Sequence, residues 1–302
     1  MMKVLVTGGA GFIGKHLVKS LLEKRYQVTI FDNFSNSTKN SLSFLADMGA
    51  SIIEGDITKP LEISNAAKDQ DVMIHLAAKI SVSESIRNPS ETFRVNVDGT
   101  RNVLAACEKN NVKKLIAASS AAVYGEGIPD VKLTEESETN PISPYGESKV
   151  QMEQEIREFA SEHDINCVIL RFFNIYGVGQ TSEYAGVVTK FMERIVQDKP
   201  LEIFGDGLQT RDFVAIDDVI SSMNNAMAYD KSGTFNIASG KAITIKELAE
   251  KMILLSGKKL KIQYTAAKKG DIKCSQADIT LAEKELLYSP KFGLDKIKEL
   301  LE

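Results

Sequence analysis

The sequence has little cysteine, no long apolar run and no excess of basic charge. Its three cysteines, Cys107, Cys167 and Cys274, are too few and too scattered for a disulfide framework or a zinc site. No apolar run approaches the ~20 residues of a membrane span, and Lys3 leads straight into a strand without the apolar core of a signal peptide. We therefore expect a soluble protein in the reducing cytoplasm, without a membrane.

Charge excludes a further class of partner. The 37 basic and 41 acidic residues give a net charge of -4, and no basic block is interleaved with aromatic residues, which disfavours nucleic acid as a partner. With 302 residues, 43% of them hydrophobic, the chain can bury a substantial core. Its length suggests about two domains.

Short apolar runs alternate with longer amphipathic stretches in the first half of the chain. This alternation predicts an α/β fold, a Rossmann-type doubly wound parallel sheet with helices on both faces. The predicted strands are Lys3 to Thr7, Val28 to Asp32, Ser51 to Glu54, Asp71 to Leu76, Leu115 to Ser119 and Cys167 to Arg171. Ligands of such sheets bind beyond the carboxyl ends of the strands.

Two long helices are predicted, at about 89 to 110 and 144 to 163, each beginning near a proline. Their apolar positions recur at helical spacing: Val95, Leu104 and Ala105 in the first, and Val150, Met152, Ile156 and Phe159 in the second. Past residue 174 the alternation loosens, leaving a strand at Leu201 to Phe204 and helices near 184 to 197, 216 to 229 and 244 to 256. We assign 1–174 to a cofactor domain, to which 213–238 returns, and 175–302 mainly to a smaller α/β substrate lobe.

The first predicted strand runs into a glycine-dense turn, Thr7-Gly8-Gly9-Ala10-Gly11-Phe12-Ile13-Gly14, and then into a helical pattern. Gly9, Gly11 and Gly14 satisfy the spacing of dinucleotide-binding loops, in which absent side chains allow the backbone to approach a pyrophosphate. The N–H groups at the start of the following helix would face the anion. A plain strand-to-helix turn is the alternative interpretation.

Asp32 ends the second predicted strand, close to where the acid that holds a ribose 2′-hydroxyl is expected. A carboxylate there repels a 2′-phosphate, so this position favours NAD over NADP. An ordinary turn residue at a strand end is the alternative.

Tyr145 and Lys149 lie four residues apart just inside a predicted helix that Ser143 would cap, so their side chains share one face. A neighbouring ammonium and the helix N-terminus both favour a phenolate, which predicts a lowered pKa for Tyr145 and a role as general base. The spacing alone is not specific, because Tyr264 and Lys268 repeat it. Ser119 and Ser120, at a strand end, distinguish the first pair, because their hydroxyls could bind a substrate alcohol.

These motifs together resemble the extended short-chain dehydrogenase/reductase family, and within it the NAD-dependent epimerases of UDP-sugars. The resemblance also rests on His75-Leu76-Ala77-Ala78, Asn96-Val97-Asp98-Gly99-Thr100, Ser119 to Gly125, Arg171 to Gly177, and Phe204-Gly205-Asp206-Gly207 through Arg211-Asp212-Phe213. The motifs recur in family order from residue 7 to about 278.

The resemblance implies a role for each matched residue. Ser120, Tyr145 and Lys149 would form the catalytic group. Asp32, Asp56 and Ile57 would hold the adenosine half of NAD, and Ala77, Lys79, Asn96 and Ser119 its nicotinamide half. We assign NAD binding also to Gly8, Gly9, Gly11, Phe12, Ile13, Gly14, Asn33, Ala78, Tyr145, Lys149 and Phe172. The substrate contacts would be Lys79, Ser120, Tyr145, Asn174, Val187, Val188, Arg211, Asp271 and Ser275, and no metal is expected. Arg211 has a physical reason of its own, because a guanidinium can grip a pyrophosphate with two donors.

The reaction implied is epimerisation at carbon 4 of a UDP-sugar, above all between UDP-glucose and UDP-galactose, by transient oxidation and return of hydride to the opposite face. Dehydratase or decarboxylase relatives share the oxidation but need extra acid and base groups. In dehydratases an Asp-Glu pair follows the serine or threonine, where this chain has Ala121 and Ala122. A non-catalytic NAD-sensing protein is a further alternative, disfavoured because Ser120, Tyr145 and Lys149 are all present.

Two finer expectations follow from the resemblance. The long helices would pair with those of a second copy through outer apolar positions to form a homodimer, unless they only cover the sheet. Ser275 falls where a tyrosine restricts such enzymes to plain hexoses, so serine there predicts that N-acetylhexosamines are also accepted. Relatives carry an arginine before Gly-Asp where this chain has Lys268-Lys269-Gly270-Asp271. A lysine can meet a phosphate only as a point charge, without the two donors of a guanidinium. The alternative is that Ser275 only caps a loop.

Overall fold

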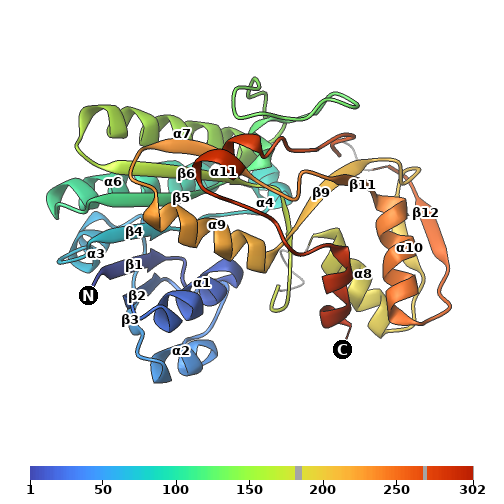
Figure 1. The fold of residues 1–302 in the computed structure, drawn as a ribbon, viewed down its shortest axis with the longest axis horizontal. Coiled ribbons are helices and arrows are strands. Elements are labelled where there is room, and N and C mark those ends of the chain that lie inside the picture. The colour runs from blue at the N-terminus through green and yellow to red at the C-terminus, as the bar shows by residue number, and fades with distance from the viewer. Residues whose placement is uncertain (181–185, 268–270, 302) are drawn as a thin grey trace.

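A seven-stranded parallel sheet dominates the structure, a computed structural model that describes residues 1–180, 186–267 and 271–301 (Figure 1). The strand order is β3-β2-β1-β4-β5-β6-β10, which is the Rossmann order extended by one strand. The strands are β1 (Lys3–Thr7), β2 (Gln27–Asp32), β3 (Ser51–Glu54), β4 (Val72–His75), β5 (Lys114–Ser120), β6 (Asn166–Phe172) and β10 (Gly233–Ile237). The predicted fold class is confirmed.

Helices cover both faces of this sheet because its strands alternate two apolar sets. Val4 and Val6 of β1 face one core, and Leu5 between them faces the other. The first core packs against α1 (Phe12–Glu23), α2 (Ser43–Asp47), α9 (Ile216–Ala228) and α11 (Thr280–Glu285). The second packs against α3 (Pro60–Ala66), α6 (Gly99–Lys109) and α7 (Pro144–Glu162).

The predicted helix at 89 to 110 is one continuous helical stretch with a change of pitch in its middle. It consists of α5 (Pro89–Phe93), the π-helical segment η2 (Arg94–Asp98) and α6, and α4 (Val82–Arg87) precedes it. Such π segments often mark functional positions, and this one carries Asn96.

The apolar positions of the two long helices mostly face inward. Leu104, Met152 and Ile156 are buried in the core between these helices and the sheet. Among the described residues, no large hydrophobic side chain of α5, η2, α6 or α7 is exposed. Val95, Val150 and Phe159 are only half-buried and Ala105 is exposed, so the expected pairing through outer apolar positions stays a prediction.

A second lobe has its own core and lies on the right in Figure 1. It contains β7 (Asn174–Tyr176), α8 (Val187–Val196), β8 (Leu201–Phe204), β9 (Thr210–Ala215), β11 (Ala242–Thr244), α10 (Ile245–Ser256), β12 (Ile262–Thr265) and the 3₁₀ segment η5 (Leu294–Leu300). β11, β9 and β7 form one small sheet, and β12 pairs with β8 in another. Residues 184 and 185 of the predicted helix at 184 to 197 lie outside the described residues.

The chain passes between the two parts several times. α9 packs on α1, β10 joins β6 in the large sheet, and Ala277 and Tyr288 lie in the core on the α1 side of that sheet. The predicted division at residue 174 stays a prediction. Two 3₁₀ segments, η1 (Lys39–Leu42) and η3 (Ala121–Val123), complete the described elements. No helix in the described ranges has both the length and the apolar character needed to cross a bilayer.

Candidate active site

The predicted catalytic and cofactor residues meet at one edge of the large sheet. Thr7 of β1 lies opposite Phe31 of β2 and His75 of β4, so these three strands end side by side. β5, which ends at Ser120, is the next strand beyond β4. The parallel direction of the strands therefore brings together residues that are more than a hundred positions apart.

The glycine loop after β1 is built by backbone packing against backbone. Gly8 has a φ of +69°, and a Cβ there would lie 2.6 Å from the Ala77 nitrogen. A Cβ on Gly14 would lie 2.5 Å from the Gly8 oxygen. Gly11 caps α1 without a side-chain hydrogen bond, which leaves the first N–H groups of the helix for another acceptor. The loop therefore fits a pyrophosphate, which such helix ends bind.

Asp32 links the end of β2 to this loop. Its Oδ2 accepts a hydrogen bond from the Ala10 nitrogen at 3.0 Å, and its Oδ1 accepts one from the Phe34 nitrogen at 2.8 Å. Burial raises the pKa of Asp32 and these backbone donors oppose that rise. Each carboxylate oxygen retains a second lone pair, so Asp32 can still accept a bond from a ribose hydroxyl.

Asp56 lies beside Asn33, as expected for residues on one half of a cofactor. The Asn33 amide donates to Asp56 Oδ2 at 3.2 Å, while the nitrogen and hydroxyl of Thr58 each donate to Oδ1 at 2.8 Å. Partial burial works to raise the pKa of Asp56, but these hydrogen bonds outweigh it and hold the pKa below its usual value. Ile57, the next residue, is buried in the second core.

Asn96 connects the loop after β4 to the catalytic helix. Its Oδ1 accepts from the Lys79 nitrogen at 2.7 Å, and its Nδ2 donates to the Lys79 oxygen at 2.9 Å and to Ser148 Oγ at 3.0 Å. The amide thus holds Lys79 in place, and Ala77 and Ala78 lie in the same loop. Both amide hydrogens of Asn96 are used, so its predicted cofactor contact would be made through the second lone pair of Oδ1.

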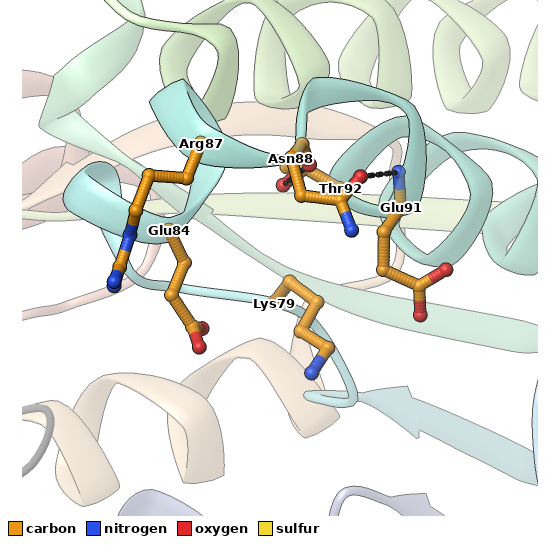
Figure 2. Close-up of a pocket in the computed structure, with 6 residues that line it drawn as sticks. All are labelled: Lys79, Glu84, Arg87, Asn88, Glu91 and Thr92. Carbon is orange, nitrogen blue, oxygen red and sulfur yellow. Dashed lines mark hydrogen bonds between the residues drawn. The ribbon is translucent and has the colours of Figure 1, made fainter.

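Lys79 lines a pocket of about 300 Å³ with Glu84, Arg87, Asn88, Glu91 and Thr92. Figure 2 shows the Lys79 amine and the carboxylates of Glu84 and Glu91 pointing to the same side of this pocket. The pocket thus adjoins the predicted site on the side of α4 and α5. Sequence reasoning identified Lys79 but missed Glu84 and Glu91, which lie on helices without a matched motif.

Tyr145 and Ser120 are in contact, and both are held by backbone bonds. Ser143 caps α7 by accepting from the Gly146 nitrogen at 3.1 Å, as predicted, and the Tyr145 nitrogen donates to Ser85 Oγ at 3.1 Å. The Ser120 hydroxyl lies close enough to the Tyr145 phenol to act on its pKa, which it works to lower. Ser120 Oγ also accepts from the Ala122 nitrogen at 3.1 Å. A hydroxyl pair of this kind can share the proton of a substrate alcohol.

The predicted lowering of the Tyr145 pKa is wrong for this structure. Burial of the side chain raises the pKa of Tyr145, and the Ser120 hydroxyl only opposes that rise. Lys149 is also buried, which lowers its pKa to about 8, and its Nζ donates to the Ala118 oxygen at 2.8 Å. The sequence spacing placed the ammonium near the phenol but did not reveal the desolvation.

Ser119 points away from Ser120, because successive residues of a strand face opposite sides. Its hydroxyl donates to Glu153 Oε1 at 2.5 Å. Sequence reasoning missed Glu153, although the signal was present: Tyr145, Lys149 and Glu153 follow at four-residue spacing. Phe172, one of the predicted cofactor residues, ends β6 and is buried in the core on the α1 side.

Arg211 and Asp271 of the predicted substrate half form an ion pair. Arg211 Nη2 lies 2.7 Å from Asp271 Oδ1, and Nη1 donates to the Thr210 oxygen at 2.8 Å. Burial lowers the pKa of Arg211, and Asp271 opposes that shift. Asn174 on β7 lies two strand positions from Tyr176 and pairs with Phe213 of the strand that carries Arg211.

Val187 and Val188 form the first turn of α8, which Gly186 caps without a side-chain hydrogen bond. Ser275 is 6% exposed. It lies between Cys274, whose oxygen accepts from the Gly127 nitrogen at 3.1 Å, and Gln276, whose oxygen accepts from the Leu133 nitrogen at 2.8 Å. Lys268, Lys269 and Gly270 lie outside the described residues, so the second member of the Tyr264–Lys268 pair does too.

Two further residues have structural partners. His75 bonds to Thr7 Oγ1 at 2.8 Å and Thr100 Oγ1 at 3.0 Å, and burial lowers its pKa to about 3, so it is a neutral core residue. Tyr124 donates its hydroxyl to Asn236 Oδ1 at 2.6 Å and is 2% exposed, so it packs in the core. No group of three metal-binding side chains comes together in the described part of the chain.

The chain is similar to a known family and to several solved structures. The model of the NAD dependent epimerase/dehydratase family matches residues 4–238. A UDP-glucose 4-epimerase of Thermotoga maritima, solved with UDP-glucose, is 34% identical, with a TM-score of 0.94 over 99% of this chain and 97% of the other. A UDP-N-acetylglucosamine 4-epimerase of Methanobrevibacter ruminantium, solved with UDP-N-acetylmuramic acid, is 35% identical, with a TM-score of 0.92 over 99% and 96%. A Thermus thermophilus UDP-glucose 4-epimerase in complex with NAD is 29% identical, with a TM-score of 0.91 over 99% and 98%.

Proposed function

Because the chain belongs to the NAD-dependent epimerase/dehydratase family, we propose that it is an isomerase that inverts carbon 4 of UDP-sugars. Its principal substrates are UDP-glucose and UDP-galactose, and the N-acetylhexosamine forms are accepted as well. The observation that carries this proposal is that Tyr145 and Ser120 lie together at the sheet edge that also carries the glycine loop. Relatives with solved structures carry the same activity in their names.

The chain's own residues divide the work of the reaction. Tyr145 takes the proton of the sugar 4-hydroxyl, and Ser120 shares that hydrogen bond. Lys149, one helical turn away, provides the positive charge that favours the phenolate form of Tyr145. The chemistry that NAD would supply when bound is the reversible acceptance of a hydride. Tyr145 then gives the proton back to the oxygen of the inverted centre.

The glycine loop and Asp32 are suited to hold the two ends of that cofactor. The backbone packing at Gly8 and Gly14 leaves no room for side chains between the loop and its neighbours. A carboxylate at Asp32 repels a 2′-phosphate, which supports NAD over NADP. The assigned NAD contacts of the remaining residues belong to this proposal.

Arg211 is the residue suited to anchor the diphosphate of the sugar nucleotide. It comes to the site already oriented by Asp271 and by the Thr210 oxygen. A diphosphate held there would let the oxidised sugar turn over while its nucleotide stays bound. Both faces of carbon 4 can then be presented to the same hydride carrier.

A dehydratase is the second candidate, and the residues after Ser120 argue against it. Ala121 and Ala122 form the 3₁₀ segment that follows β5, where dehydratases are expected to carry an acidic pair. Alanine cannot transfer a proton, so elimination of water would lack its acid and base. A non-catalytic NAD-binding protein would have no use for the Tyr145–Ser120 pair.

The deciding experiment incubates the purified protein with a panel of UDP-, dTDP- and GDP-hexoses and identifies the products by NMR. We expect the 4-epimer of UDP-glucose and of UDP-N-acetylglucosamine, without net formation of NADH. A 4-keto-6-deoxy product would establish a dehydratase instead. No conversion of any sugar, with NAD bound, would leave only a sensing role.

A homodimer and a cytoplasmic location are part of the proposal. Arg101 of α6 and Glu155 of α7 are joined at 2.5 Å on the outer side of these helices. A dimer through the helices would combine such charged residues with the half-buried Val150 and Phe159 and the exposed Ala105. Light scattering at micromolar concentration should give twice the mass of the chain, and a monomer mass would contradict the dimer. Cell fractionation tests the location.

A further inference from the structure

The face of α7 that covers β5 carries three polar side chains at four-residue spacing. Tyr145 lies beside Ser120, the Lys149 ammonium donates to the Ala118 oxygen at 2.8 Å, and Glu153 accepts from Ser119 Oγ at 2.5 Å. Residues four apart on a helix are neighbours. The third member therefore lies beside the second, at the point where β5 delivers its catalytic serine.

Glu153 is a fully buried anion. Its side chain is 0% exposed. Its Oε1 also accepts from Arg171 Nε at 2.9 Å, and its Oε2 accepts from Arg171 Nη2 at 2.7 Å and Arg157 Nη1 at 3.0 Å. Burial works to raise the pKa of Glu153, but the Arg171 pair outweighs it and lowers the pKa. The carboxylate is therefore charged at neutral pH.

Arg171 reaches Glu153 from β6 and is itself fixed on its far side. Its Nη1 donates to the Tyr124 hydroxyl at 2.8 Å and to the Glu135 oxygen at 3.0 Å. A buried ion pair of this kind does not by itself stabilise a protein relative to apolar residues of similar volume, because both charges lose their water. Stability therefore does not explain why the Glu153–Arg171 pair lies beside the catalytic group.

The groups around Lys149 leave Glu153 as its electrostatic support. In the protein without cofactor and substrate, Tyr145 on α7 adds no charge beside Lys149, because burial raises the pKa of its phenol. His75 on β4 is neutral, and Arg171 on β6 and Arg157 on α7 are cations bonded to Glu153. Burial lowers the pKa of Lys149 to about 8, and Glu153 opposes that fall.

We propose that Glu153 is a positioning residue that keeps Lys149 in its ammonium form and holds the catalytic end of β5 through Ser119. The link to catalysis rests on the proposed epimerase function. The effect on Lys149 itself does not, because it is a property of the protein without substrate or cofactor. Lys149 must be charged to favour the phenolate of Tyr145, so Glu153 extends the pH range in which the base works.

The test substitutes Glu153→Gln, which keeps a carbonyl oxygen for Ser119 and removes the charge. An opposite charge at this range shifts a pKa by about one unit or more. We expect the pKa of Lys149 to fall by at least about one unit from its value in the unaltered protein. The alkaline limb of kcat that reports loss of the Lys149 proton should then move to lower pH.

The pKa of Lys149 is read directly in the cofactor-free protein from the pH dependence of its ¹³Cε NMR signal, assigned with Lys149→Arg. Arg157→Gln is the matched control, because its side chain is 49% exposed and its loss leaves the Arg171–Glu153 pair intact. We expect no shift of the Lys149 titration in that variant. A Lys149 titration unchanged in Glu153→Gln would overturn the proposal, whether or not any sugar is epimerised.

A double variant separates the effect on Lys149 from simple pairing with Arg171. Glu153→Gln combined with Arg171→Gln removes both charges, so it should fold even where the single variant leaves an unpaired arginine. We expect the pKa of Lys149 to stay below its original value, because the supporting carboxylate is still absent. Full return of that pKa to its original value would show that Glu153 only neutralises Arg171.

Discussion

Helices α1 and α8 begin alike, and their surroundings differ. Each has a glycine N-cap in extended conformation without a side-chain hydrogen bond, Gly11 for α1 and Gly186 for α8. The loop before α1 is predicted to bind the pyrophosphate of NAD, and Val187 and Val188 at the start of α8 are predicted substrate contacts. Around α1 a Cβ on Gly14 would lie 2.5 Å from backbone, whereas a Cβ on Gly186 would have no atom of the described residues within 4 Å.

The difference shows how the two halves of the site are built. The cofactor half is made of backbone from adjacent strands of the large sheet, so its shape is set by the fold itself. The substrate half is made of side chains from small sheets and helix ends, with Arg211 and Asp271 holding each other. A fold of this kind can change its substrate without changing its cofactor.

The largest effect is expected when a methyl group is added to the glycine loop at the start of α1. Gly14→Ala should destabilise the protein by about 3 kcal/mol or more and remove NAD binding, because the new methyl group meets backbone that cannot rotate away. Thermal unfolding and NAD titration measure the two effects. Gly293→Ala is the control, because that glycine caps η5 at a φ of -87° with nothing within 4 Å. Normal NAD binding by Gly14→Ala would refute the assigned role of the loop.

Removing the hydroxyl of Tyr145 should abolish turnover and leave the cofactor half and the substrate half of the site intact. Tyr145→Phe is expected to fold and bind NAD while kcat falls about 10²- to 10⁴-fold, because only the ionisable oxygen is lost. Rates near those of the unaltered enzyme would remove Tyr145 as the base. The measurement is epimerisation of UDP-galactose beside NAD titration of the same preparation.

The third prediction enlarges a side chain in the substrate half. Ser275→Tyr should lower kcat/KM for the N-acetyl sugars by about 10²-fold and change that for UDP-glucose much less, because it fills the space an acetamido group needs. Ser275 is only 6% exposed, so thermal unfolding must accompany the kinetics. An equal fall for both sugars, or no change in either, would show that Ser275 is not the gate.

A smaller effect is expected when the diphosphate anchor becomes a point charge. Arg211→Lys should raise KM for UDP-sugars about tenfold with little change in NAD affinity, because lysine cannot keep the Thr210 and Asp271 bonds while binding a diphosphate. Steady-state kinetics give KM and kcat separately. A change confined to kcat would place Arg211 outside the anchor.

The smallest effect is expected when a methyl group is added to Gly186 at the start of α8. Gly186→Ala should change stability by less than about 0.5 kcal/mol and leave KM nearly unaltered, because its φ of -66° suits alanine and open space surrounds it. Denaturant unfolding and KM for UDP-glucose are the measurements. A loss as large as that in Gly14→Ala would mean that the two helix ends are equally constrained.

The large sheet was predictable from sequence, and the second lobe was only partly so. The strands β1 to β6 are mostly buried, apolar and separated by amphipathic helices, so their pattern stands out. β7 and β11 have three residues each and lie among glycine and polar residues, which gives no periodic signal. β10 is the one strand of the large sheet that was not predicted. It is separated in sequence from β6 by much of the second lobe.

In the candidate site, residue identity was easier to predict than residue state. Tyr145 lies beside Ser120, and Lys149 follows one turn along α7, yet burial by packing of distant segments raises the pKa of Tyr145, which the motif did not predict. Asn96 was identified, but its bonds to Lys79 and Ser148 required the π segment and the loop after β4 to be in place. Glu153 follows Tyr145 and Lys149 at four-residue spacing, but it was missed because no motif included it.

The position of β10 also bears on how the protein is made. This strand, residues 233 to 237, closes the edge of a sheet whose other six strands are complete by residue 172. A ribosome will have released a long further stretch of chain before β6 acquires its neighbour. During that interval a growing chain presents an unpaired strand edge and the uncovered apolar surface that α9 later protects. Synthesis of this enzyme therefore includes a period in which chaperones have a defined surface to cover.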